Sequence, residues 1–232
     1  RAARSTAHAP IAAPRRRYSL SANQNRHQEF EERNTDGELA KFRWDAEIGQ
    51  TITGAVEVST FSGQAPIQTG AVSVIARQQK TKQFGINWNF HPSYAIKTRI
   101  SEIDTSFESV PGTPDSVLAG LNRTDENQSI GVAYTTGTGS TLGLFLNNSI
   151  GNFPLRQVTS PGQSVSNNFE QQDVELQGQW NLSAITRLQF SLATVKRKHD
   201  ELPARDYSGL NYRIDALYQP TTKSTLTLGF AR

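Results

Sequence analysis

Few residues in this chain have the types and spacing that catalysis requires. Asp173 and Glu175 are separated by one residue, and paired carboxylates can act as acid and base in glycoside hydrolysis. On a β-strand, however, residues at this spacing share one face. Two charges on one face are also expected of an ordinary solvated surface, and we favour this second interpretation.

Other catalytic and metal-binding motifs are missing. The four histidines, His8, His27, His91 and His199, have no ligand spacing with one another or with a carboxylate. Cysteine is absent, which excludes a thiolate nucleophile and a cysteine-based zinc site. Neither a glycine-rich phosphate loop nor a Gly-x-Ser-x-Gly elbow occurs. We therefore predict no catalytic residue, no metal and no cofactor, and we predict that the protein is not an enzyme.

Net charge is only +3, and basic residues are interleaved with acidic ones. A nucleic-acid-binding domain would carry a basic patch or stripe, so no nucleic-acid partner is expected. No run of about 18 apolar residues occurs, which argues against a transmembrane helix.

Alternation of apolar and polar residues is the dominant pattern, and it is clearest in residues 172–232. A β-strand points successive side chains to opposite faces, so each alternating segment has one apolar and one polar face. The segments here are 173–180, 187–192, 210–216 and 226–230. Short turns and a polar loop join them, which predicts an antiparallel meander.

The same alternation runs through the upstream part of the chain. Strands are predicted near residues 17–27, 42–48, 52–60, 71–76, 86–90, 94–100, 130–134 and 142–146. Short turns are predicted near residues 50, 92, 138, 183 and 221. Longer loops are predicted at 29–36, ending in the turn Asp36-Gly37, and at 62–70, 105–127, 152–170 and 198–206. This pattern predicts an all-β fold, an antiparallel up-and-down transmembrane β-barrel of roughly ten to twelve strands.

The polar face of these strands is predicted to line a lumen. Its charged members are Arg43, Asp45, Glu47, Lys97, Arg99, Asp173, Glu175, Arg187, Arg213 and Asp215. In a soluble β-sandwich the same residues would face solvent. The apolar face needs either a second sheet or lipid to cover it, and the continuous lattice favours lipid. Closure into a barrel also satisfies the backbone groups of every strand.

Outward orientation is predicted for the apolar residues of the C-terminal meander. They are Val174, Leu176, Trp180, Leu188, Phe190, Leu192, Tyr212 and Ile214. Four aromatic residues, Phe90, Tyr134, Trp180 and Tyr218, each precede a short turn on the apolar face. Tyrosine and tryptophan favour membrane–water interfaces, so these residues predict a ring at one rim. In a sandwich they would be core aromatics instead.

Residues 1–15 are arginine-rich and free of acids, and we expect a flexible lead-in there, although a transit peptide has a similar composition. The barrel domain is predicted to occupy residues 16–232. The chain is expected to be a fragment, so that the barrel is incomplete.

Several runs suggest a family. Residues 42–54 (FRWDAEIGQTITG) and 88–93 (WNFHPS) resemble outer-membrane β-barrel proteins encoded with bacterial exopolysaccharide-biosynthesis genes. Residues 205–212 (RDYSGLNY) and 218–226 (YQPTTKSTL) are similar to the strand–turn–strand unit of those barrels. The resemblance implies a bacterial outer-membrane location, long extracellular loops and exopolysaccharide export or assembly. Its implied partners are the lipid bilayer, polysaccharide and other proteins of the exopolysaccharide machinery.

A second function class remains open. The chain could be a non-transporting surface module, a barrel or a sandwich, whose long loops bind a partner or a sugar. Both classes place polar residues on one face, and they differ in what covers the apolar face.

Overall fold

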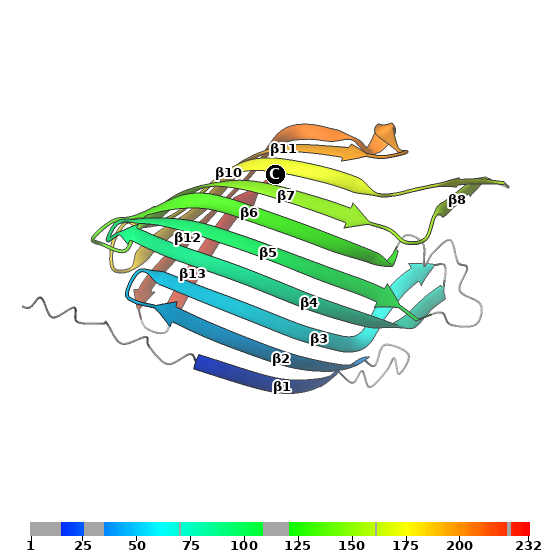
Figure 1. Ribbon diagram of the computed structural model, residues 1–232, viewed down its shortest axis with the longest axis horizontal. Coiled ribbons are helices and arrows are strands. Elements are labelled where there is room, and N and C mark those ends of the chain that lie inside the picture. The colour runs from blue at the N-terminus through cyan, green and yellow to red at the C-terminus, as the bar shows by residue number, and fades with distance from the viewer. Residues whose placement is uncertain (1–14, 26–34, 70, 109–120, 161, 222–223) are drawn as a thin grey trace, which may run out of the picture.

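The computed structural model describes residues 15–25, 35–69, 71–108, 121–160, 162–221 and 224–232 (Figure 1). Eleven strands form one antiparallel sheet in the order β1-β2-β3-β4-β5-β6-β7-β10-β11-β12-β13. The first six are β1 (Arg15–Asn25), β2 (Thr35–Ile48), β3 (Ile52–Thr69), β4 (Ala71–His91), β5 (Tyr94–Phe107) and β6 (Arg123–Thr135). The others are β7 (Thr141–Asn152), β10 (Phe169–Asn181), β11 (Thr186–His199), β12 (Tyr207–Thr221) and β13 (Ser224–Ala231). The predicted all-β, up-and-down meander is confirmed.

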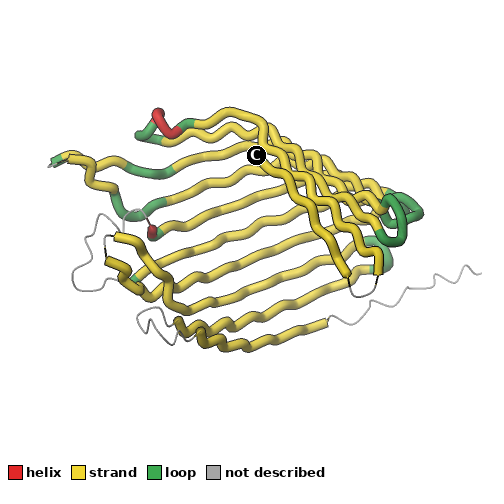
Figure 2. Tube along the Cα trace, turned by 180° about the vertical axis from the view of Figure 1, so that it is seen from behind, coloured by secondary structure: helices red, strands yellow, loops and turns green. Residues whose placement is uncertain are grey.

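The sheet is strongly curled. Seen from behind, β12 and β13 cross in front of the other strands at a steep angle (Figure 2). Short turns join the strands at one end, and the longer connections lie at the other, where the β3–β4 hairpin instead continues beyond its neighbours (Figure 1). Strands β1 and β13 are the two edges, and over the described residues no pairing closes the sheet between them.

Pairing registers keep even-numbered residues on one face and odd-numbered residues on the other. From β2 to β13 each register joins residues of the same parity, apart from the irregular ends of two hairpins. The odd-numbered side chains Ala95, Ala133 and Val195 are only 5–8% exposed, whereas the even-numbered Leu144 and Leu146 are 54% and 56% exposed. Crowding of the odd-numbered side chains identifies their face as concave, and the even-numbered face is convex.

Glycines on the concave face make room for aromatic rings from the next strand. Gly131 lies directly opposite Phe145. A Cβ added to Gly131 would lie 2.5 Å from the carbonyl oxygen of Leu144 and closer still to the Phe145 ring. Gly151 likewise lies directly opposite Phe169, whose ring occupies the space that a Cβ at Gly151 would need. Larger residues at these positions would displace the rings that cover the backbone.

Some connections are shorter than predicted. The predicted loop at 62–70 is wrong, because β3 continues to Thr69 and pairs with β4 along its whole length. Separate strands were predicted at 71–76 and 86–90, which is also wrong, because both segments belong to the single strand β4. The turn predicted at Asp36-Gly37 is also wrong, because both residues belong to β2 and pair with residues of β1. Cross-strand hydrogen bonds override the local turn preference of glycine at these positions.

Pro66 is tolerated within β3 because the end of this hairpin extends beyond its neighbours. Pairing of β2 with β3 stops at Gly63, and pairing of β4 with β5 begins at Arg77. Pro66 therefore has a strand on one side only, and an edge position does not require its missing N–H.

The longer connections are partly structured. The predicted loop at 105–127 is shorter than expected on both sides, because β5 reaches Phe107 and β6 begins at Arg123. The predicted loop at 152–170 contains a small hairpin of β8 (Gln157–Ser160) and β9 (Gln163–Val165). A 3₁₀ turn, η2 (Pro203–Arg205), lies in the predicted loop at 198–206. Residues 1–14 of the predicted lead-in lie outside the described residues, and Arg15 begins β1.

Glycine substitutions test the ring packing. Gly131→Ala should lower the free energy of unfolding by about 1–3 kcal/mol, because its methyl group has no space. Gly85→Ala is the matched control on the same face, where the nearest atom is 3.4 Å from the added Cβ. Urea titrations followed by tryptophan fluorescence should show a loss for Gly131→Ala alone, and equal losses would contradict the packing described here.

Candidate functional site

All ten charged residues predicted for the polar face lie on the concave face. They are Arg43, Asp45, Glu47, Lys97, Arg99, Asp173, Glu175, Arg187, Arg213 and Asp215, each odd-numbered within a paired strand. One row across the sheet joins Asp45, Ala55, Gly85, Arg99, Ser129, Asn147 and Asp173 through successive register partners. Charge on this face is therefore mixed with small and amide side chains.

Strands β2 and β3 carry one ion-pair cluster of this face. The Arg43 Nε atom lies 2.8 Å from the Asp45 carboxylate, and its Nη1 atom lies 3.3 Å from Glu57. Lys41 approaches the other oxygen of Glu57 at 2.7 Å. Lys41 and Glu57 were not among the residues predicted for this face, although their place in the alternation of polar and apolar residues identifies them as members of it. A hollow of about 350 Å³ beside this cluster is also lined by Glu47 and Arg99.

A second group lies on β7, β10, β11 and β12. Glu175 accepts hydrogen bonds from Asn147 at 3.2 Å and from the Ser191 hydroxyl at 2.5 Å. The Arg213 Nε atom donates to Asp215 at 2.6 Å. The hollow between them has a volume of about 470 Å³, and Lys97, Phe145, Gln177, Gln179 and Gln189 also line it. Such a surface offers many hydrogen-bond donors and acceptors and little uncompensated charge.

Asp173 and Arg187 lie outside these two groups. Asp173 accepts a hydrogen bond from Gln171 at 2.8 Å, and Gln171 in turn accepts one from Arg197 at 2.8 Å. Arg187 lines a hollow near the turn at 182–185. The ten residues therefore share a face without forming a single site.

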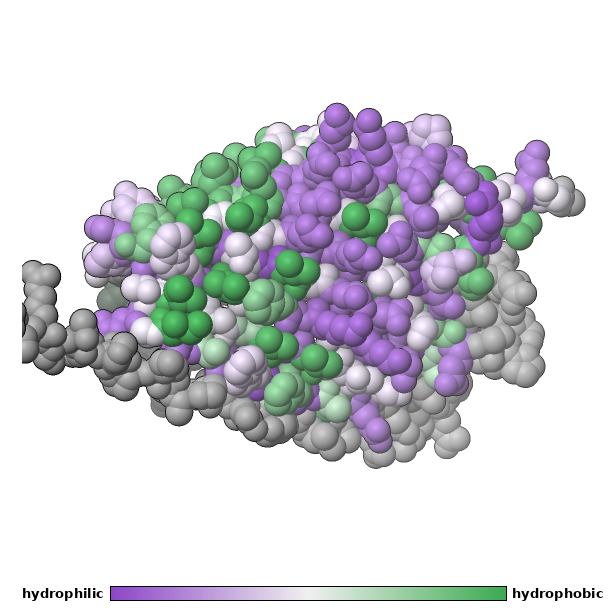
Figure 3. All heavy atoms as spheres, viewed as in Figure 1, coloured by the Kyte–Doolittle hydropathy of each residue, from purple (hydrophilic) through white to green (hydrophobic). Residues whose placement is uncertain are grey.

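The convex face carries all eight apolar residues predicted to share a surface. They are Val174, Leu176, Trp180, Leu188, Phe190, Leu192, Tyr212 and Ile214. Apolar side chains gather toward the short-turn end of this face and hydrophilic ones toward the long-loop end (Figure 3). The hydrophilic part includes the ion pair of Lys82 and Glu102, at 2.8 Å.

Aromatic rings cluster at the short-turn edge of the convex face. The centroids of Phe90 and Tyr94 are 6.2 Å apart, and those of Tyr94 and Tyr134 are 5.1 Å apart. Trp88 adds an edge-on contact with Phe90 at 5.8 Å. Trp180 and Tyr218 lie on the same face of β10 and β12. The four predicted rim residues thus share the convex face, and Trp88 and Tyr94 extend their cluster.

The apolar band crosses the hydrogen-bonded rows obliquely. One row joins Ile48, Ile52, Trp88, Ile96, Val132, Leu144, Leu176, Leu192 and Tyr212. In β2 the band ends at the row itself, because Ile48 is the last convex residue before the turn. In β12 the band continues six residues beyond the row, from Tyr212 to Tyr218. A shift of about 20 Å along the strands over eight strand spacings, about 38 Å, corresponds to a tilt of about 30°.

The opposite boundary of the band shifts in the same direction. Phe42 and Val58 are register partners and apolar. The same row is charged at Lys82, Glu102, Glu126, Glu170 and Lys198, and from β4 to β11 its one apolar member is Ile150 on β7. The band therefore keeps a similar width while it runs diagonally across the sheet.

The connections at the long-loop end are linked by Arg156 and Glu201. The Arg156 guanidinium donates to both oxygens of Glu201, at 3.0 and 2.6 Å. The backbone N–H of Ser166 also donates to Glu201, at 2.9 Å. These bonds, chiefly the one from Arg156, lower the pKa of the Glu201 carboxyl below its ordinary value. The β8–β9 hairpin is thereby held against the connection between β11 and β12.

Within the described ranges, no helix is long and apolar enough to cross a membrane. The same ranges contain no group of three or more His, Cys, Asp or Glu side chains that could hold a metal ion. No known family model matches the chain, and a search of curated proteins finds no relative.

The Arg156–Glu201 link predicts a pH-dependent loop. Because the folded pKa of Glu201 lies below its ordinary value of 4.5, the link contributes fully above that pH and is lost as pH falls through the folded pKa. Hydrogen exchange should show the protection factor of the Ser166 N–H falling between neutral pH and about pH 3. Glu201→Gln should lower it already at neutral pH.

Asp200→Asn is the control for this experiment, because it removes a neighbouring loop acid while the Arg156–Glu201 contacts stay in place. Its protection factor at Ser166 should match that of the unmodified protein. Equal protection in Glu201→Gln and the unmodified protein would contradict a role for the carboxylate.

Proposed function

We propose that the protein forms the wall of a transmembrane β-barrel in a bacterial outer membrane. The observation that supports this most strongly is the oblique apolar band on the convex face. Barrel strands tilt by about 35–45° from the barrel axis, so a flat hydrocarbon layer would contact residues that shift along successive strands. The tilt of about 30° derived from the band and the strand spacing is close to this range.

The dimensions of the band also support a bilayer. Along β10 the band extends from Val174 to Trp180, roughly 20 Å of strand. At a strand tilt of about 30° this is about 17 Å along the barrel axis, and the reach of the terminal side chains brings it nearer the apolar height of about 25 Å typical of outer-membrane barrels. Aromatic residues lie at the short-turn boundary, where their rings would meet the membrane–water interface.

The concave face suits passage of a hydrophilic solute. Its charges are compensated within the face, as in Arg43 with Asp45 and Arg213 with Asp215. Amide and hydroxyl groups supply further hydrogen bonds beside Phe145. These groups are better suited to binding the hydroxyls of carbohydrates than to binding a single ion. Exopolysaccharide export or assembly, the role implied by the sequence resemblance, is the specific function we propose.

The non-transporting binding module keeps one specific observation in its favour. The long connections are fixed to each other by Arg156 with Glu201 and by Arg205 with Asn167, at 2.6 Å. A preorganised loop surface reduces the entropy lost on binding. Such a module would bind its partner through these loops without solute passage.

Arginine substitutions on the two faces test membrane insertion. Leu144→Arg should destabilise the protein by about 2–4 kcal/mol in lipid vesicles, because it places a charge in hydrocarbon. Gln177→Arg, an exposed concave position one strand away, should cost much less. Leu144 is 54% exposed, so a water-facing sheet would tolerate both. Urea titrations showing no difference between the two variants would refute the proposal.

Ion selectivity tests passage along the concave face. Replacing Lys97, Arg187 and Arg213 by Gln should shift permeation toward cations, because Asp215 then loses its positive partner and wall charges set selectivity. Planar-bilayer recordings measure the reversal potential under a salt gradient. Lys82→Gln and Lys198→Gln on the convex face are controls and should leave it unchanged. A protein that inserts but passes neither ions nor oligosaccharides would favour the binding module.

A further inference from the structure

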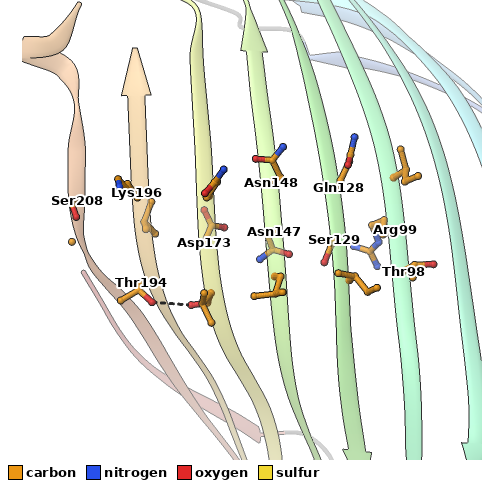
Figure 4. A pocket seen from close by; sticks show the side chains of 17 residues that line it. Thr98, Arg99, Gln128, Ser129, Asn147, Asn148, Asp173, Thr194, Lys196 and Ser208 are labelled. Carbon is orange, nitrogen blue, oxygen red and sulfur yellow. Dashed lines mark hydrogen bonds between the residues drawn. The ribbon is translucent and has the colours of Figure 1, made fainter. Parts of the chain in front are cut away.

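A groove of about 800 Å³ crosses the convex face where the apolar band meets the hydrophilic region (Figure 4). It spans six strands, from β5 to β12. Its floor is the backbone between two rows of even-numbered side chains. Figure 4 shows Lys196, Asn148 and Gln128 at one level of the groove, on β11, β7 and β6.

The two walls of the groove differ in chemistry. The wall on the short-turn side belongs to the apolar band and contains Thr98, Ile130, Leu146, Val174 and Thr194. The wall on the long-loop side is mainly polar and contains Ile100, Gln128, Asn148, Gln172, Lys196 and Ser208. A ligand that fills the groove must therefore be amphipathic, with its polar part toward the long-loop end.

Groups on the polar wall have unused bonding capacity. The Asn148 Oδ1 atom is buried and accepts no hydrogen bond. An unsatisfied buried acceptor is costly, and each such group in a native structure calls for an explanation. Within the described residues no carboxylate forms an ion pair with Lys196, and its register partners are Gln172 and Ser208. The wall thus offers the exposed amides of Gln128 on β6 and Gln172 on β10, and a cation on β11.

We infer that this groove binds the headgroup of a phosphorylated glycolipid, with an acyl chain on the apolar wall. The inference rests on the proposed membrane location. The polar row from Gln128 to Lys196 crosses three strand spacings, about 14 Å, which is longer than one phosphoethanolamine group and suits a disaccharide. The exposed side-chain amides of Gln128 and Gln172 can bind sugar hydroxyls. Lys196 supplies a point charge for a phosphate.

Charges around the groove set the orientation of the ligand. Lys196 and Lys198 lie together on β11, with Glu170 opposite Lys198. Glu126 lies on β6, beyond Gln128 on the long-loop side. Phosphate is therefore favoured at the β11 end of the row, and uncharged sugar hydroxyls are favoured over β7 and β6.

Lipid retention tests this site. The protein is reconstituted into phosphatidylcholine vesicles containing equal small amounts of lipid A, a phosphorylated glucosamine disaccharide lipid, and phosphatidylethanolamine. After mild detergent extraction, native mass spectrometry counts the lipids that remain bound. We expect lipid A to be retained in preference to phosphatidylethanolamine. Lys196→Ala should reduce its retention about tenfold, as expected for loss of one charge-assisted bond, and adding Gln128→Leu to this variant should reduce it further.

Lys82→Ala is the control, because Lys82 is a cation on the same face that does not line the groove. It should retain lipid A normally. Equal retention of both lipids, or equal retention by Lys196→Ala and Lys82→Ala, would overturn the assignment of the groove. Flotation of the vesicles separates this outcome from failure of the proposed function, because a protein that does not float with lipid refutes the membrane location itself.

Discussion

Unbroken antiparallel pairing, with the same parity on every strand, is the constraint on which the rest of this structure depends. A slip of one residue between any two strands would exchange the faces of every strand beyond it. Because the registers hold from β2 to β13, Trp44 and Phe230 lie on one face although the sheet's width separates them. The hydrogen-bonded backbone thus converts a local alternation into two continuous surfaces.

These two surfaces carry different kinds of side chain. The concave surface brings opposite charges into contact, and its glycines allow rings such as Phe145 to cover the backbone. The convex surface leaves large apolar side chains about half exposed, including Ile130 and Val132. Exposed apolar area of this extent is unusual for a soluble monomer and indicates an interaction surface. Under the proposed membrane location, the oblique course of this band relative to the hydrogen-bonded rows follows from the tilt of the strands in a flat hydrocarbon layer.

Sequence alternation was sufficient to predict the all-β class, the meander and the face of every charged residue proposed for the concave surface. It failed where pairing overrides local preference, as at Gly63 and Pro66 within β3 and at Asp36 within β2. The alternation of residues also could not predict contacts between segments that are distant in the sequence. Arg156 and Glu201 are far apart in the chain, and only the return of neighbouring connections to the same end of the sheet brings them together. The groove at Asn148 likewise requires the register of six strands.

The proposed contact of the convex band with hydrocarbon is tested most directly by spin labels along β7. The chain lacks cysteine, so single cysteines at 142 and at 144–148 can be labelled without other changes, whereas the Phe145 ring leaves no space for a side chain at Gly143. In lipid vesicles, we predict that accessibility to oxygen alternates, is high at 142, 144 and 146, and falls at 148. Labels at 145 and 147 should respond instead to a water-soluble nickel complex. Uniform accessibility, or nickel access at 144 and 146, would contradict the account.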